Sequence, residues 1–156
     1  MDMSKTYQYS QLTEPDQIRL VSLQPDPDLE APVRCSLITG SLDFYEHDLV
    51  EHYIALSYVW GDASMRRIVQ VGDGSFMNIT VSLESALRHL RDKTRTFLVW
   101  ADGLCINQDD IEERNRQVPM MGRIYGTARA TIIFLQFKSD GAGAYLKELS
   151  QGELDQ

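Results

Sequence analysis

The strongest constraint on the fold is the alternation of short apolar runs with segments of helical periodicity. Apolar runs lie at 54–59, 97–101 and 130–135, and between them apolar residues recur at helical spacing at 83–90 and 111–125. Strands that are apolar throughout are typical of a parallel sheet covered on both faces. The chain is therefore predicted to be an α/β protein, with the three strands running the same way because such crossovers are right-handed.

A β-hairpin is predicted between the first of these strands and the first helix. Arg67–Val71 and Phe76–Thr80 flank Gly72-Asp73-Gly74-Ser75, which is a turn signal. The helix that follows has Ser82 in a position to cap its first turn. The hairpin is therefore interpreted as an insertion into the strand–helix alternation.

The second helix is expected to begin at Asp109 or Asp110 and to reach about Tyr125. Pro119 interrupts this segment. Because proline removes one backbone hydrogen bond, we expect a kink near Asn115–Arg116.

The two ends of the chain have weaker patterns. Ile18–Leu23 and Val33–Leu42 are predicted strands, separated by a loop rich in proline and acidic residues. A short helix is expected around Ala144–Leu149, followed by a polar end that frays. The predicted division is an N-terminal arm with lead-in strands at 1–50, a core domain at 51–138 and a C-terminal short helix with a flexible tail at 139–156.

Length and charge limit the classes of partner. A chain of 156 residues suits one domain, which should bury about 70% of its extended surface. The net charge of −8 argues against nucleic acid or an anionic membrane as a partner. No apolar run is long enough to span a membrane, and the start Met1–Lys5 lacks the features of a signal peptide. We therefore expect a soluble, cytoplasmic domain.

Cysteine and histidine do not predict a metal site. Cys35 and Cys105 are the only thiols, and their spacing from His47, His52 and His89 fits no zinc pattern. Cys105 lies in an apolar stretch with no histidine near it in sequence, so a buried structural thiol is favoured over a nucleophile.

The polar loops that follow two of the predicted strands are the candidate functional segments. Ser57–Asp62 and Asp102–Asp110 both follow the carboxyl ends of parallel strands, where open α/β sheets place their ligand crevices. In the first loop, Trp60 offers a stacking face, Gly61 a close backbone approach and Asp62 an acceptor for a sugar hydroxyl. The alternative interpretation is a core tryptophan, a turn glycine and a capping aspartate.

The second loop also has two interpretations. Asn107 and Gln108 offer paired donors and acceptors. Glu112 and Glu113, which follow them, could serve acid/base or electrostatic chemistry. Alternatively, Asp110 and Glu113 resemble a capping box, and acids in a first turn stabilise the helix dipole.

Two motifs carry a resemblance to a known family. The first is YIALSYVWGD at 53–62, and the second is WADGLCINQD at 100–109, continued by Glu113–Arg114. They resemble, in the same order, two motifs of the fungal heterokaryon incompatibility (HET) domain. The resemblance covers about residues 53–135 closely and 18–52 loosely.

The resemblance implies both a fold and a function. HET domains are distantly similar to TIR domains, so we expect a parallel-sheet, flavodoxin/TIR-like three-layer fold with an inserted β-hairpin and an N-terminal β segment. The implied function is that of an effector in fungal non-self recognition and programmed cell death. Some TIR domains cleave NAD⁺, so the implied activity is that of an NAD⁺ glycohydrolase, with NAD⁺ as substrate and no other cofactor or metal.

The same resemblance implies a set of site residues. Glu113 is by position the nearest candidate for the catalytic glutamate and Glu112 the second, with the carboxylate stabilising an oxocarbenium-like transition state. Arg114 would meet a phosphate. The residues expected to bind the substrate are Ser57, Trp60, Gly61, Asp62, Asp102, Asn107, Gln108 and Arg114.

A non-catalytic module is the alternative function. Such a module would act through self-association or an unknown protein partner in cell-death signalling. If Glu113 is consumed by structural hydrogen bonds, the module is favoured. An open polar crevice between the two loops would favour the enzyme.

Overall fold

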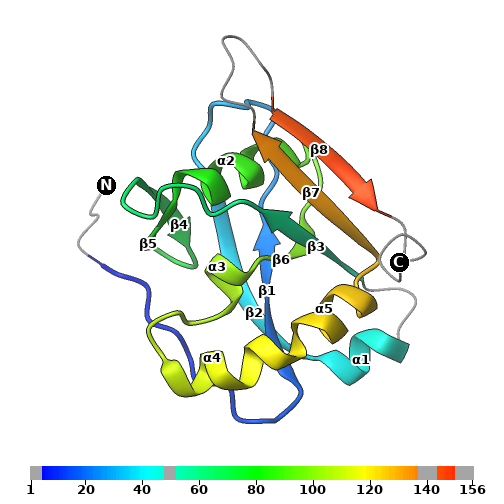
Figure 1. Cartoon of the computed structure of the whole chain (residues 1–156). Coiled ribbons are helices and arrows are strands. Elements are labelled where there is room, and N and C mark those ends of the chain that lie inside the picture. The colour runs from blue at the N-terminus through cyan, green and yellow to red at the C-terminus, as the bar shows by residue number, and fades with distance from the viewer. Residues whose placement is uncertain (1–4, 48–51, 137–143, 150–156) are drawn as a thin grey trace.

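The fold is a single mixed β-sheet flanked by short helices, as the computed structural model in Figure 1 shows. Residues 5–47, 52–136 and 144–149 are described. Within these described residues, eight strands form one sheet in the order β5-β4-β2-β1-β6-β3-β7-β8. The strands are β1 (Gln17–Leu23), β2 (Arg34–Ser41), β3 (Tyr53–Tyr58), β4 (Arg66–Val71), β5 (Ser75–Thr80), β6 (Phe97–Trp100), β7 (Ala130–Gln136) and β8 (Ala144–Leu149). The helices are α1 (Leu42–His47), α2 (Val81–Leu90), α3 (Asp102–Cys105), α4 (Ile111–Gln117) and α5 (Met121–Thr127), with a 3₁₀ turn at Val118–Met120.

The three apolar strands predicted to be parallel are parallel. Strand β3 pairs in parallel with both of its neighbours, Ile54 lying opposite Val99 of β6 and Ala130 of β7. The β4–β5 hairpin is also confirmed, with positive φ angles at Gly72 and Gly74 in its turn. These elements are the ones whose sequence patterns were strongest.

The expectation of a parallel, flavodoxin/TIR-like sheet is not confirmed, because the sheet is mixed. Strand β1 is antiparallel to β2 on one side and to β6 on the other. It lies in the middle of the sheet, and four of its apolar side chains are fully buried. The polar residues Arg19 and Ser22 make this strand look half exposed in sequence, yet Arg19 is buried as well. The N-terminal strands therefore supply the centre of the sheet.

The helix expected around Ala144–Leu149 is wrong, because this segment is strand β8. It pairs antiparallel with β7, Thr131 lying opposite Leu149 and Gln136 opposite Ala144. Figure 1 shows β8 on the outer side of β7. Pairing with β8 provides hydrogen-bond partners for backbone groups of β7 that would otherwise lie at the edge of the sheet. The free energy gained from this tertiary pairing exceeds the helical preference of the residues in β8.

The second long helical segment begins as expected, with Asp110 as the cap of α4, but the cap of the first segment and the break in the second differ from the prediction. The cap of α2 is Thr80, whose Oγ1 accepts from the Leu83 amide at 3.2 Å, whereas Ser82 donates to the Val59 carbonyl. Pro119 lies in the 3₁₀ turn between α4 and α5, so the chain breaks there instead of kinking at 115–116. A proline in the first turn of a new helical segment leaves no hydrogen bond unmade.

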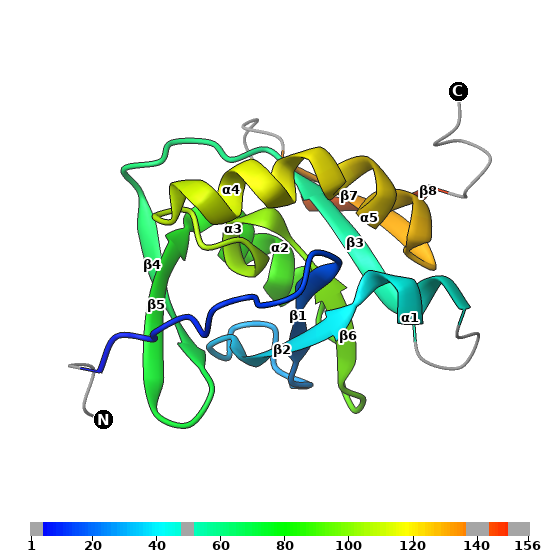
Figure 2. The same cartoon turned by 90° about the horizontal axis from the view of Figure 1, so that it is seen from below.

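Helices α4 and α5 run end to end along one side of the sheet, with α1 beside α5 (Figure 2). Helix α2 contacts β3, β4 and β5, and α3 contacts β1 and β5. The loops after β3 and β6 thereby come to lie next to the β4–β5 hairpin and α2. This arrangement places the two polar motif segments at one site.

Candidate functional site

The two motif loops converge on a crevice of about 230 Å³, as their positions after parallel strands predicted. Trp60, in the loop after β3, donates from Nε1 to the Asp102 carboxylate after β6 at 3.3 Å. The hairpin, α2 and the N-terminal segment complete the walls. The lining residues are Tyr9, Tyr58, Trp60, Arg66, Met77, Asn78, Thr80, Leu83, Gly103, Asn107, Gln108 and Asp109.

Aromatic side chains form one wall of the crevice. The rings of Tyr58 and Trp60 are stacked, with centroids 6.4 Å apart and planes inclined by 15°. Trp60 is 37% exposed, so it is not a core tryptophan. Burial raises the pKa of the Tyr58 hydroxyl and the neighbouring Asp102 carboxylate raises it further, so this hydroxyl stays protonated at neutral pH.

Amide and carboxyl groups also line the crevice. Gln108 is fixed by a 2.9 Å hydrogen bond from Nε2 to the Asp102 carbonyl, and the Asn107 side chain accepts from the Asp109 amide at 3.3 Å. Among the described residues that line the crevice, Asp109 supplies the carboxylate and Arg66 the cation. The crevice thus offers stacking faces, amides and one charge of each sign.

Glu113 lies outside the lining and is buried. Its carboxylate receives two hydrogen bonds from the Arg19 guanidinium, at 2.6 and 2.9 Å, and one from the Asn107 amide at 2.5 Å. Its own amide donates to the Asp110 side chain at 3.1 Å, so Asp110 caps α4 as the alternative interpretation predicted. Both carboxylate oxygens are therefore engaged by the protein.

Sequence reasoning missed Tyr9, which lines the crevice, and Arg19, which holds Glu113. Besides Glu113, Arg19 donates to the carbonyls of Cys105 and Ser10, at 3.2 and 2.7 Å, and its guanidinium lies 4.7 Å from the centre of the Tyr9 ring. The available signal was a single arginine inside an otherwise apolar strand, since a buried charge needs a partner.

The remaining predicted residues do not line the crevice. Gly61 adopts a positive φ of 67°, which explains the glycine. Asp62 accepts from the backbone and hydroxyl of Ser64 at 2.9 and 2.6 Å, which closes a local turn. Of the predicted site residues, Trp60, Asn107 and Gln108 line the crevice, and Asp102 is joined to Trp60 by a hydrogen bond. The predicted residues outside the lining are Ser57, Gly61, Asp62, Asp102, Glu112, Glu113 and Arg114.

Neither thiol is placed to act as a nucleophile. Cys35 and Cys105 are free and buried, and burial raises the pKa of each to about 12. At neutral pH both are protonated. The structural interpretation of Cys105 is therefore confirmed.

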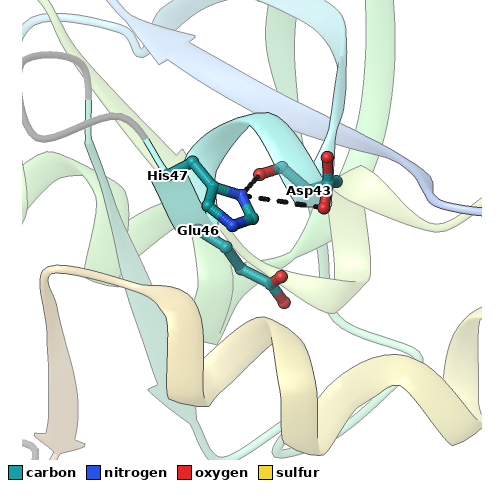
Figure 3. Close-up of side chains that lie close together, drawn as sticks. All are labelled: Asp43, Glu46 and His47. Carbon is teal, nitrogen blue, oxygen red and sulfur yellow. Dashed lines mark hydrogen bonds and ion pairs between the residues drawn. The ribbon is translucent and has the colours of Figure 1, made fainter.

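One group of potential metal ligands lies away from the crevice, on α1. Asp43, Glu46 and His47 are exposed and close together (Figure 3). The His47 ring nitrogen Nδ1 contacts the Asp43 carbonyl at 2.8 Å, and Glu46 pairs with Arg123 at 2.5 Å. The Asp43 carbonyl and carboxylate raise the pKa of His47, which favours the protonated ring over a metal ligand. This group gives no ground for a metal centre.

No helix within the described residues is both long and apolar enough to cross a membrane.

Comparison with known proteins identifies the family. Residues 53–155 match the family model described as heterokaryon incompatibility protein (HET). The chain belongs to the HET family. It is 31% identical to heterokaryon incompatibility protein 6, OR allele, of Neurospora crassa, over 94% of this chain and 23% of that protein. The HET chain thus spans less than a quarter of this relative's length, and no solved structure matches it.

Proposed function

We propose that this HET chain acts in fungal non-self recognition and that its crevice binds a small molecule, with NAD⁺ the first candidate. The role follows from the name of the Neurospora relative, a heterokaryon incompatibility protein. The observation that carries the ligand proposal is that both family motifs contribute to one crevice. A set of residues that served only the core would not need an open polar cavity.

The size of the crevice suits one half of a dinucleotide. Ligand sites for drug-sized molecules occupy roughly 300–1,000 Å³, and this crevice has about 230 Å³. A single ring and its ribose would stack on Trp60 and meet the amides of Asn107 and Gln108. The guanidinium of Arg66 lies on the lining and would meet a phosphate.

An NAD⁺ glycohydrolase reaction would need a carboxylate beside the ribose. The bond from the nicotinamide nitrogen to ribose C1′ breaks and water adds to C1′, giving nicotinamide, ADP-ribose and a proton. Asp109 is the carboxylate on the lining, so we assign it the stabilisation of the developing positive charge. Glu113 and Glu112 are the carboxylates that the sequence predicted for this role. The contacts of Glu113 favour a structural role, and Glu112 is exposed on α4.

A non-catalytic interaction module in cell-death signalling is the second candidate. It is favoured by the structural hydrogen bonds of Glu113 and by two exposed apolar residues on one side of the α4 segment. Ile111 is 69% and Val118 53% exposed, and residues seven apart in a helix share a face. Such a surface suits self-association or a protein partner.

The test is NAD⁺ binding by titration calorimetry and NAD⁺ consumption by chromatography. Trp60→Ala should weaken binding at least tenfold, whereas Val59→Ala, at the exposed neighbouring position outside the lining, should not change it. Asp109→Asn should retain binding and lose consumption. If the wild type binds NAD⁺ without consuming it, the proposed enzymatic activity is overturned and the proposed ligand site is retained. If no binding occurs and Ile111→Asp abolishes self-association in sedimentation, the module is the function.

A further inference from the structure

We propose that the N-terminal segment Lys5–Ser10 is part of the ligand site and that Tyr9 contacts the bound molecule. The inference rests on the proposed function, since it concerns the same crevice. Tyr9 lines the crevice, although the family model matches only residues 53–155. A wall of the site therefore comes from outside the segment that the family model describes.

The segment is anchored to the exposed edge of the hairpin. The Tyr7 amide donates to the Phe76 carbonyl, and the Phe76 amide donates to the Lys5 carbonyl, both at 2.9 Å. Thr6 forms a parallel bridge with Phe76 of β5. In Figure 2 this segment, in dark blue, runs from the β4–β5 hairpin toward β1. These bonds bring the chain to the crevice and fix its path.

The Tyr9 side chain is held by three further contacts. Its hydroxyl donates to the Leu104 carbonyl at 2.7 Å. The Arg19 guanidinium lies 4.7 Å from the centre of the Tyr9 ring. The Tyr7 ring packs edge-on against the Tyr9 ring, with ring centroids 5.4 Å apart. Because Arg19 also donates to the Ser10 carbonyl, the same guanidinium fixes the ring and the backbone next to it. Tyr9 is thus a preorganised wall and not a loose cover.

Glu113 links two residues that line the crevice. Its carboxylate binds Arg19, which holds Tyr9, and accepts from the backbone amide of Asn107. Among the described residues, three aromatic side chains line the crevice: Tyr9, Tyr58 and Trp60. Three aromatic rings with few charges favour a ligand that presents a flat ring, because stacking on these faces is its main source of affinity.

The experiment measures binding to the full chain of three probes, NAD⁺, nicotinamide mononucleotide and adenosine monophosphate. Tyr9→Ala should weaken binding of the tightest-binding probe about tenfold, because one contact between aromatic rings is lost. Tyr9→Phe keeps the ring and should stay within about threefold. The matched control is Gln8→Ala, an exposed neighbour in the same segment that does not line the crevice. Contact can also be observed directly by NMR on protein with selectively labelled tyrosine. A cross-peak between the ring protons of the ligand and a tyrosine ring, present in the wild type and absent in Tyr9→Phe, would show that the ligand touches Tyr9.

The outcomes separate this inference from the proposed function. Binding that Trp60→Ala weakens and Tyr9→Ala leaves unchanged would overturn the role of Tyr9 and keep the ligand site. Tyr9-dependent binding of adenosine monophosphate without NAD⁺ would support the inference and overturn the choice of NAD⁺. If none of the three probes binds, both proposals are overturned.

Discussion

Arg19 in the central strand β1 and Glu113 in α4 form a two-hydrogen-bond ion pair, at 2.6 and 2.9 Å, with side chains only 2% and 3% exposed. The pair joins the N-terminal half of the sheet to the second HET motif. Glu113 was the candidate catalytic residue, so any loss of activity in a Glu113 variant must be separated from loss of the fold. Stability measurements on this pair therefore come before activity measurements.

We predict that Glu113→Gln lowers the free energy of unfolding by about 3–5 kcal/mol, because it leaves the buried charge of Arg19 without its partner. Urea denaturation followed by circular dichroism measures this change. The matched control is Glu112→Gln, on the exposed side of the same helix turn, which should stay within about 0.5 kcal/mol of the wild type. Equal stability of Glu113→Gln and the wild type would show that the ion pair is not structural and would return Glu113 to the candidate catalytic residues.

We predict that the double variant Arg19→Met with Glu113→Leu is more stable than the sum of its single variants implies. Each single change leaves one buried charge, whereas the double change removes both and replaces them with apolar volume. A coupling energy of about 2 kcal/mol or more is expected from a double-mutant cycle in urea. The Asn107 amide and the Ser10 carbonyl lose their partners, so full wild-type stability is not expected. An additive cycle would contradict a direct interaction of the two side chains.

The sequence predicted the parallel strands and the convergence of their loops, since both follow from local apolar patterns and a general rule for α/β sheets. The sequence did not predict that β1 lies at the centre of the sheet, because the polar Arg19 made this buried strand resemble a half-exposed one. The partner that makes this burial tolerable is 94 residues away. Strand β8 was missed for a related reason, as its backbone pairing with β7 is a tertiary contact. Contacts between residues far apart in the chain produce no periodic pattern in the sequence.

The candidate site shows the same division. Trp60, Asn107 and Gln108 were found because each follows a recognisable strand. Tyr9 was not, since its position depends on backbone pairing with β5 and on Arg19. Glu113 was chosen by position relative to a remote family, and such a choice carries no information on whether the carboxylate is free.

Stability should fall at alkaline pH because of the two buried thiols. Burial raises the pKa of Cys35 and Cys105 from about 9 to about 12, so the folded protein keeps protons that the unfolded chain releases. The contribution of the two thiols to the free energy of unfolding is complete below pH 9 and is lost as the pH rises from 9 toward 12. Between pH 8 and 10 the free energy of unfolding should drop by about 3 kcal/mol from these two thiols. The Cys35→Ala/Cys105→Ala variant should show a smaller drop in the same urea series, and an identical drop would assign the effect to other groups.

Gly103→Ala should both destabilise the HET chain and narrow its crevice. A Cβ at this position would overlap the Tyr58 hydroxyl and lie 2.9 Å from Cδ2 of Leu83, so both side chains must move. Because Leu83 is buried and Tyr58 stacks on Trp60, we expect a loss of about 1–3 kcal/mol.

The matched control for this substitution is Gly122→Ala in α5, where an added Cβ has nothing within 4 Å. It should leave stability unchanged or raise it by up to about 1 kcal/mol, because alanine is the better helix former. Both free energies come from urea denaturation, and the crevice is followed by the fluorescence of Trp60, since Trp100 is fully buried. A shift in the Trp60 emission with Gly103→Ala and none with Gly122→Ala would show that the displaced Tyr58 ring moves into the crevice. Wild-type stability and emission in Gly103→Ala would mean that Tyr58 has room to retreat, and the glycine would then need another explanation.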